Sequence, residues 1–196
     1  MKIAIFGGTF DPIHIGHLII AENVLNLFDI DNVIFMPAGL PPHKTDRSIT
    51  DGRYRLEMVR LAIKDNKYFK VSDWEISKNK KSYTVDTLRY MKKSNKYDKI
   101  MFIMGADSLL NIHHWKEPEY ILGHALIIVA ARPGFNIEKI FTNSKFRPYL
   151  ENIQFMDSFL LDISSSSIRD FLVNRKSVKY LVPDNVISYI QQHDLY

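Results

Sequence analysis

The chain has 196 residues, of which 46% are hydrophobic, with a formal net charge of +4 at pH 7 and no cysteine. This length suits one domain with a sizeable core, and the lack of cysteine excludes disulfides and thiolate metal sites. No run of about 18 apolar residues occurs, so no membrane-spanning helix is expected. The first residues lack the basic start and long apolar core of a signal peptide, which favours a cytoplasmic location.

Short apolar runs alternate with segments of helical spacing along the chain. Strands are predicted at Lys2–Phe6, Asn32–Met36, Lys70–Ser72, Lys99–Met104, Ala125–Ala130 and Ile153–Met156. Helices are predicted at Gly16–Phe28, Gly52–Asp65, Val85–Lys93, Ser108–Ile112, Ser166–Val173 and Asn185–His193. This order predicts an α/β fold, a Rossmann-like parallel sheet with helices on both faces, in one domain over residues 1–196 whose C-terminal helical part starts at about residue 164.

Ligands of such sheets bind at the carboxyl ends of the strands. The segments expected along that rim are Gly7–His17, Pro37–Lys44, Gly105–Asp107 and Ala131–Gly134. The loop Ala38–Thr50 contains two consecutive prolines and is long enough to be typical of functional or mobile loops.

The first of these segments has a distinctive composition and reads GGTFDPIHIGH over residues 7–17. Gly7 and Gly8 allow a sharp turn between strand and helix, and the free N–H groups of the helix start attract anions. Residues three apart share a helix face, so His14 and His17 are expected to face one oxyanion, with Gly16 leaving room for it. The ordinary alternative is that both histidines are structural.

A second segment, ISSSSIR over residues 163–169, places hydroxyl groups at a helix start and an arginine one turn later. Such hydroxyls and such a guanidinium suit phosphate oxygens. The alternative is that the serines only cap the helix and that Arg169 pairs with Asp170 or another surface acid.

Together, these two segments resemble the signatures of the HxGH nucleotidyltransferase superfamily, and within it the bacterial nicotinate-nucleotide adenylyltransferases. The resemblance covers essentially the whole chain. It implies adenylyl transfer from ATP to nicotinate mononucleotide, giving nicotinate adenine dinucleotide and pyrophosphate, in NAD biosynthesis. Ser166 stands where the superfamily usually has threonine, and this exchange keeps the hydroxyl.

The resemblance also implies roles for individual residues. The catalytic residues would be His14, His17 and Arg169, and ATP would be bound by Gly7, Gly8, Thr9, Phe10, Gly105, Asp107, Ile163, Ser164, Ser165 and Ser166. Mg²⁺ would arrive with ATP, without direct protein ligands. The role of Asp107 stays open between a helix cap, a contact with the ribose and a contact with the water shell of the metal.

Three further segments distinguish this branch of the superfamily: PPHK at 41–44, SYTVDTL at 82–88 and IHHW at 112–115. Lys44 offers a cation to an anionic acceptor, Thr84 a helix start for a carboxylate, and Trp115 a flat face for a pyridine ring; Arg132 is placed with them. Their ordinary alternatives are a solvent-exposed lysine, a helix cap and a half-buried tryptophan. A zinc site at His43, His113 and His114 is not expected.

Other functions share some of these features. Pantetheine-phosphate adenylyltransferases have both signatures but lack the three branch segments, and class I aminoacyl-tRNA synthetases need more residues for tRNA-binding domains. A nucleotide-sensing module would not need Arg169. The lysine groups at 78–81 and 92–99 are typical of solvated faces, so neither nucleic acid nor membrane is an expected partner, while a homo-oligomer stays open.

Overall fold

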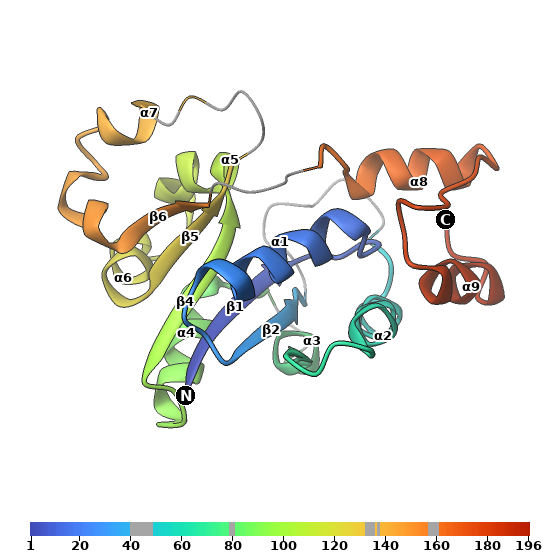
Figure 1. Ribbon diagram of the computed structural model, residues 1–196, viewed down its shortest axis with the longest axis horizontal. Coiled ribbons are helices and arrows are strands. Elements are labelled where there is room, and N and C mark those ends of the chain that lie inside the picture. Colours follow the sequence, from blue (N-terminus) through green and yellow to red (C-terminus); the bar gives the residue numbers. More distant parts are fainter. Residues whose placement is uncertain (40–48, 79–80, 132–135, 137, 157–160) are drawn as a thin grey trace.

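The computed structural model describes residues 1–39, 49–78, 81–131, 136, 138–156 and 161–196. Its strands form one parallel sheet in the order β3-β2-β1-β4-β5-β6. The strands are β1 (Lys2–Gly8), β2 (Asn32–Pro37), β3 (Phe69–Val71), β4 (Lys99–Gly105), β5 (Leu126–Ala130) and β6 (Ile153–Met156). The order reverses at β1, which pairs with both β2 and β4 (Figure 1). The predicted α/β class is confirmed.

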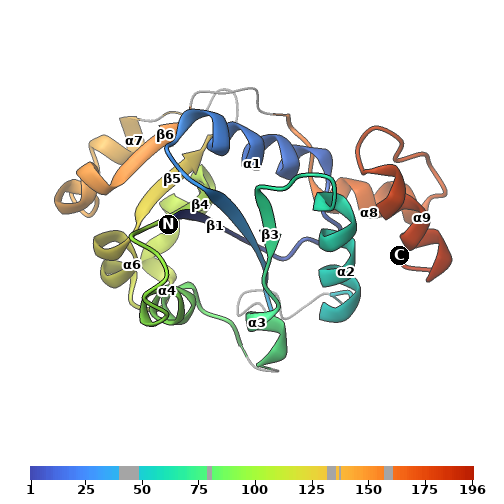
Figure 2. The ribbon, with the colours of Figure 1, turned by 60° about the horizontal axis from the view of Figure 1, so that its bottom comes forward.

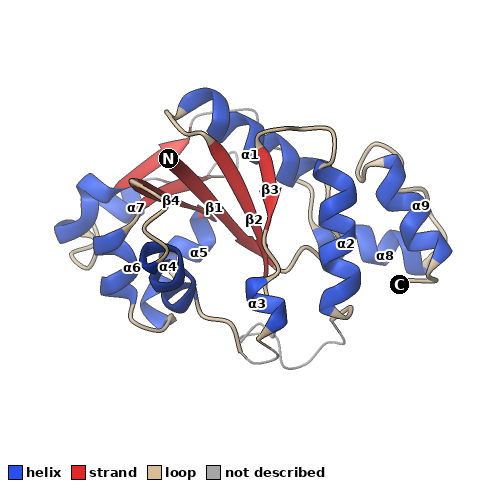
Figure 3. Cartoon of the chain, turned by 90° about the horizontal axis from the view of Figure 1, so that it is seen from below, coloured by secondary structure: helices blue, strands red, loops and turns tan. Residues whose placement is uncertain are grey.

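Helices cover both faces of this sheet. The helices are α1 (Ile15–Leu27), α2 (Gly52–Ile63), α3 (Trp74–Ser77), α4 (Thr84–Lys93), α5 (Ala106–Leu110), α6 (Pro118–His124), α7 (Glu138–Phe141), α8 (Ser165–Val173) and α9 (Asp184–Gln192), with short 3₁₀ turns at Ile112–His114 and Arg147–Asn152. Figures 2 and 3 show α1 on one face and α4 and α6 on the other. No helix in the described ranges is long and apolar enough to cross a membrane.

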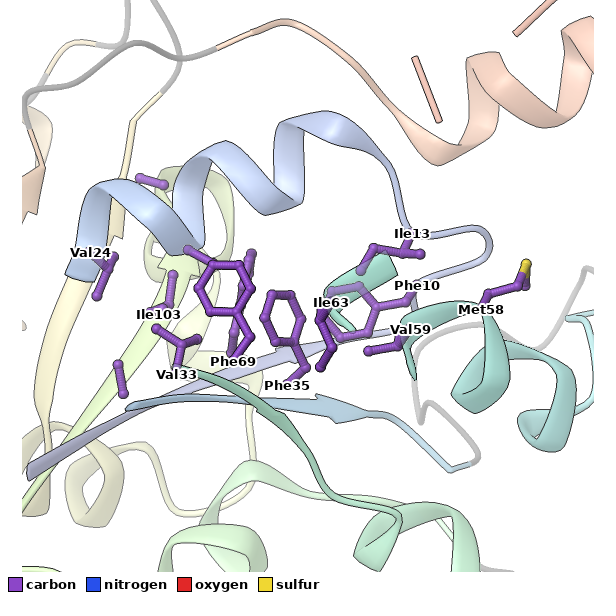
Figure 4. Packing of buried hydrophobic residues seen from close by; sticks show 14 of the residues in the cluster. Phe10, Ile13, Val24, Val33, Phe35, Met58, Val59, Ile63, Phe69 and Ile103 are labelled. Carbon is purple, nitrogen blue, oxygen red and sulfur yellow. The ribbon is translucent and has the colours of Figure 1, made fainter. Parts of the chain in front are cut away.

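The two faces bury two separate apolar clusters, as side chains that alternate along a strand require. In β1, Ala4 and Phe6 belong to the cluster under α1, α2, α8 and α9, whereas Ile3 and Ile5 belong to the cluster under α4, α5 and α6. Figure 4 shows the aromatic centre of the first cluster, where Phe10 from the β1–α1 turn lies beside Phe35. The same turn therefore belongs to the core and to the rim of the sheet.

The structure differs from the sequence prediction mainly in its shorter helices. The helix predicted at Ser108–Ile112 runs from Ala106 to Leu110, and the helices α3, α6 and α7 were not predicted. The C-terminal helices α8 and α9 lie beyond the β3 edge of the sheet, beside α2 (Figure 3). There the Nδ2 of Asn185 donates a hydrogen bond of 2.7 Å to the carbonyl oxygen of Leu61 in α2.

Candidate active site

The turn between β1 and α1 is shaped by a buried aromatic ring. Phe10 has a left-handed φ of 50°, and its side chain is only 2% exposed among the rings of Phe6, Phe35 and His17. A Cβ on Gly8 would come within 2.8 Å of this ring, so the glycine is required by packing. Because the ring lies in the core, the predicted contact of Phe10 with ATP could involve only its backbone.

The two histidines lie together at the start of α1, as predicted. Their rings stack with centroids 3.6 Å apart and 24° between the planes. The backbone N–H of His14 donates to Nδ1 of His17 at 3.2 Å, so in a neutral His17 the hydrogen is on Nε2. The room beside Gly16 was expected to serve an oxyanion, but the imidazole of His14 takes it, because a Cβ there would lie 3.1 Å from Nδ1 of His14.

Burial keeps His17 neutral. Desolvation lowers its pKa well below the ordinary 6.5, and the neighbouring His14 lowers it further. A neutral imidazole with its hydrogen on Nε2 is a hydrogen-bond donor that needs no extra proton. The pair can therefore present donors to an anion at neutral pH.

The second predicted segment contacts the first directly. Nη1 of Arg169 donates to the carbonyl oxygen of Asp11 at 2.6 Å, and the Ser165 hydroxyl donates to the carbonyl oxygen of Pro12 at 2.9 Å. Arg169 also lies 4.0 Å from a carboxylate oxygen of Asp11. Its acidic partner is thus Asp11 in the first segment, and the alternative pairing with Asp170 is not observed among the described contacts.

The serines of α8 divide two tasks. Ser164 is the N-cap, since its Oγ accepts a hydrogen bond from the backbone N–H of Ser167 at 3.1 Å. Ser166 accepts from Nη2 of Arg169 at 3.3 Å. The capping alternative is therefore correct for Ser164, while Ser165 and Ser166 join the helix to the β1–α1 turn and to Arg169.

A cavity of about 350 Å³, the first cavity, opens between these two segments. Its lining consists of polar groups from both segments and apolar groups from the strand ends: Phe6, Thr9, Asp11, His14, Gly16, His17, Ile20, Ile103, Met104, Gly105, Ala130, Leu161, Ile163, Ser164, Ser165, Ser166 and Arg169. All three predicted catalytic residues are included. The concentration of donors in one cavity makes it suitable for a polyanion.

A second cavity, of about 290 Å³, lies next to the first. It is lined by Phe6, Gly7, Gly8, Thr9, Ala38, Glu75, Ser82, Tyr83, Thr84, Phe102, Ile103, Met104, Gly105, Ser108, Trp115, Lys116 and Ile121. Phe6, Thr9, Ile103, Met104 and Gly105 line both cavities. The two cavities therefore meet where β1 and β4 end, which is the position where sheets of this type bind ligands.

The predicted acceptor residues Thr84 and Trp115 both line the second cavity. Thr84 is the first residue of α4, so its N–H lies at the positive end of that helix. Trp115 is partly buried, as its ordinary alternative requires, yet it also borders the cavity. Lys44 and Arg132 lie outside the described residues.

Other predicted positions differ from their expected places. Gly7 and Gly8 line the second cavity and not the first. Asp107 is exposed, lines neither of the two cavities and does not cap α5, because Gly105 is the N-cap. Within the described ranges no three His, Asp or Glu side chains lie close enough to hold a metal ion.

Comparisons with known proteins agree with this geometry. The cytidylyltransferase-like family matches residues 5–171. The chain is 41% identical to the "Probable nicotinate-nucleotide adenylyltransferase" of Clostridium tetani, over all of this chain and 98% of that protein. The chain belongs to the nicotinate-nucleotide adenylyltransferase family. A protein of the same name from Caldicellulosiruptor bescii is 43% identical, with 100% and 99% of the two chains covered.

Solved structures show the same fold. The Plasmodium falciparum nicotinic acid mononucleotide adenylyltransferase complexed with NaAD matches all of this chain and 97% of its own, with a TM-score of 0.82 and 24% identity. The same enzyme complexed with APC matches with a TM-score of 0.81.

Several residues of the site were not predicted from the sequence. The cavities are also bordered by Asp11, Glu75 and Lys116. The buried Arg55 donates a hydrogen bond to the carbonyl oxygen of Thr9 in the β1–α1 turn. Asp11 is part of the GGTFDP segment and Lys116 follows Trp115, so their neighbours could have indicated them. Nothing in the residues around Arg55 and Glu75 signals their roles.

Glu75 belongs to a buried network below the second cavity. The Thr87 hydroxyl donates to its Oε1, and the Ser82 hydroxyl, which accepts a hydrogen bond of 3.1 Å from the Gly39 N–H, interacts with it as well. Burial raises the pKa of Glu75 above its ordinary value, and these hydroxyls only partly offset that rise. The network joins the end of β2 to α3 and α4.

Proposed function

We infer that the two cavities carry out the reaction of this family, the transfer of an adenylyl group from ATP to nicotinate mononucleotide in NAD biosynthesis. The observation that carries this inference is their junction. A cavity rich in anion donors and a cavity with an aromatic face and a cation share Thr9 and Gly105. Two bound nucleotides would thus meet at the ends of β1 and β4.

The reaction is a phosphoryl substitution. An oxygen of the mononucleotide phosphate bonds to the α-phosphorus of ATP, and the bond from that phosphorus to the bridging oxygen breaks, so pyrophosphate leaves. A phosphate monoester loses its second proton near pH 6, and the nucleophile therefore needs no general base at neutral pH. Catalysis then consists of positioning and of charge neutralisation.

The first cavity supplies the groups for ATP, which we take to enter as its Mg²⁺ complex. His17 donates from Nε2. Because His14 stacks against it and both residues line the first cavity, both contact the phosphates around the reacting centre in this proposal. Arg169 uses one donor on Asp11 and one on Ser166, so among the described contacts the remaining guanidinium N–H groups are available to phosphate oxygens. Thr9 and the run Ile163–Ser166 complete the ATP site in this proposal.

The second cavity supplies the groups for the acceptor. The start of α4 at Thr84 faces the nicotinate carboxylate, and Trp115 stacks on the pyridine ring. Lys116 is exposed, and its Nζ lies 3.3 Å from Oδ1 of Asp86. It adds positive charge for an anionic acceptor. Lys44 and Arg132 remain predictions for acceptor binding. A cytoplasmic location also remains a prediction, and a homo-oligomer remains open.

Pyrophosphate release tests the function directly. The protein with MgATP is given nicotinate mononucleotide, nicotinamide mononucleotide or phosphopantetheine in separate assays, and the nicotinate compound should be used best. His17→Ala should lower kcat about 10²- to 10³-fold, the typical cost of one preorganised donor. Preference for phosphopantetheine, or wild-type turnover by a folded His17→Ala variant, would contradict the proposal.

Arg169→Lys tests the ATP site separately. It should recover only part of the activity lost in Arg169→Ala, because a point charge does not replace a planar fork. Arg175→Lys, in the turn after α8, is the matched control and should leave kcat and the KM for ATP unchanged.

A further inference from the structure

Asp11 is a buried acid held by side chains from the other end of the chain. It is 4% exposed, and its Oδ1 accepts a hydrogen bond of 2.6 Å from the Tyr196 hydroxyl. Its Oδ2 lies 4.0 Å from Nη1 of Arg169, the same nitrogen that donates to the Asp11 carbonyl oxygen. One acid thus joins Tyr196 to the proposed phosphate-binding arginine.

Tyr196 has no direct access to the substrates. It lines neither of the two cavities, and its hydroxyl interacts with the side chains of Asp11 and Thr50. Burial and the adjacent carboxylate raise its pKa, so the hydroxyl keeps its proton and remains a donor. Any effect of Tyr196 on catalysis is therefore indirect, and of its two hydroxyl partners Asp11 is the one that lies beside Arg169.

The backbone of the β1–α1 turn is held at neighbouring points by the same C-terminal part. Ser165 donates to the Pro12 carbonyl oxygen, and the Ile15 N–H donates to the carbonyl oxygen of Leu181 at 2.9 Å. Asp11 differs from these points in that its carboxylate also lies 4.0 Å from a nitrogen of the Arg169 guanidinium. A rotation of the Asp11 carboxylate would move the charge that faces Arg169.

We propose that Tyr196 is a positioning residue for ATP binding, whose hydroxyl fixes the Asp11 carboxylate and thereby the Arg169 guanidinium at the phosphate site. This rests on the proposed function only in the assignment of the first cavity to ATP. Tyr196→Phe removes the hydroxyl and keeps the ring, so packing is preserved. The guanidinium then samples more orientations, and phosphate binding is weakened.

The test compares Tyr196→Phe with Tyr189→Phe. Tyr189 lies on α9, and its ring packs against Tyr54 and His193 away from Asp11, so it controls for the loss of a tyrosine hydroxyl in the same region. Calorimetric titration with MgATP should show a Kd raised about three- to tenfold for Tyr196→Phe and an unchanged Kd for Tyr189→Phe. The KM for the acceptor should be unchanged in both.

A double-mutant cycle separates positioning from a general loss of structure. In an Arg169→Ala background, Tyr196→Phe should add no further increase to the Kd for MgATP, because its effect passes through the missing arginine. An equal increase in the Kd for MgATP in both backgrounds would overturn the proposal. So would an increase in the acceptor KM as large as the increase in the Kd for MgATP. So would a wild-type Kd for MgATP in Tyr196→Phe.

This experiment also distinguishes the inference from the function. MgATP binding is measured without an acceptor, so a wrong acceptor in the proposed function leaves the result intact. If the wild-type chain binds no MgATP, both proposals fail. Thermal unfolding of each variant, expected within a few degrees of the wild type, shows that a change in Kd does not come from unfolding.

Discussion

The Arg55 guanidinium donates a hydrogen bond of 2.7 Å to the carbonyl oxygen of Thr9, across 46 residues of sequence. Its other nitrogens donate to the carbonyl oxygens of Thr50, Ala38 and Gly39 at 2.8, 2.8 and 3.1 Å. The side chain is 2% exposed, and burial lowers its pKa despite the nearby Asp11. One buried cation thus holds the ends of β1 and β2 in place.

Replacing that cation should destabilise the fold. Arg55→Met leaves buried carbonyl oxygens without donors, so the free energy of unfolding should fall by roughly 2–4 kcal/mol. Arg53→Met on the same helix is the control. Its side chain is 83% exposed in an ion pair with Asp51, and the expected loss is much smaller than for Arg55→Met. Urea unfolding of both variants checks this, and equal losses would disprove the role of Arg55.

The desolvated imidazole of His17 should make stability depend on pH. Its folded-state pKa lies well below 6.5, so between these two values the unfolded chain binds a proton that the folded chain does not. The free energy of unfolding must therefore fall as the pH drops below 6.5, by up to about 1.4 kcal/mol per pH unit. Unfolding at pH 7 and pH 5.5 should show a smaller fall for His17→Gln than for the wild type. Equal falls would mean that His17 is not the group responsible.

The N-cap of α8 separates stability from ATP binding. Ser164→Ala should lower the free energy of unfolding by about 1 kcal/mol, whereas Ser164→Asn and Ser164→Asp both restore a cap. Only the aspartate sets a negative charge beside bound phosphates, so Ser164→Asp should bind MgATP about tenfold or more weakly while Ser164→Asn binds it normally. Comparable MgATP affinity of these two variants would remove Ser164 from the phosphate site.

Selectivity between the acid and the amide acceptor should depend on Thr84. The helix start supplies donors that suit a carboxylate and leave the amide NH₂ without an acceptor, at a cost of about 1–3 kcal/mol. Thr84→Asp should reduce kcat/KM for the acid selectively, since two carboxylates would face each other. Trp115→Ala should raise KM for both acceptors alike. A selectivity ratio that follows Trp115 instead of Thr84 would reverse the assignment.

Gly105 should tolerate a side chain in the fold but not in the reaction. Its φ of −73° and ψ of 155° suit any residue, and among the described residues a Cβ would meet no atom within 4 Å beyond its own chain neighbours. Gly105→Ala should therefore change stability by less than about 1 kcal/mol, because the lower entropy of the unfolded chain is offset by the weaker N-cap that alanine makes for α5. It should nevertheless lose about tenfold or more in kcat, because the methyl group enters the junction of the cavities. Gly123→Ala in α6, with an ordinary contact at 3.9 Å, should gain stability without losing kcat.

The sequence predicted the sheet well because β1, β2, β4 and β5 are apolar runs that end at a turn signal, whereas the short edge strands β3 and β6 each include a polar residue. The missed helices have physical reasons. α3 and α7 have four residues each, too few for helical periodicity to appear, and such short helices depend on tertiary packing. α6 begins after Glu117, whose left-handed φ of 51° gives no sign in the sequence.

Sequence reasoning proposed the site residues whose side chains themselves suit a phosphate, as do those of His14, His17 and Arg169. It missed residues whose side chains serve the backbone. Arg55 binds carbonyl oxygens, which every residue carries, so no spacing points to them. The contact of Tyr196 with Asp11 spans 185 residues, and only the fold brings those two side chains together.

The shared lining of the two cavities has a kinetic consequence. In the proposed reaction, the new bond joins the two nucleotides into one molecule that occupies both cavities. When one half of this dinucleotide detaches, the other half stays bound and keeps the free half near its own cavity at an effective concentration of about millimolar. Rebinding then competes with escape, so the dinucleotide should leave more slowly than either substrate. If release of the dinucleotide limits turnover, variants that weaken binding in one cavity without changing the groups at the reacting phosphates raise kcat while they lower affinity.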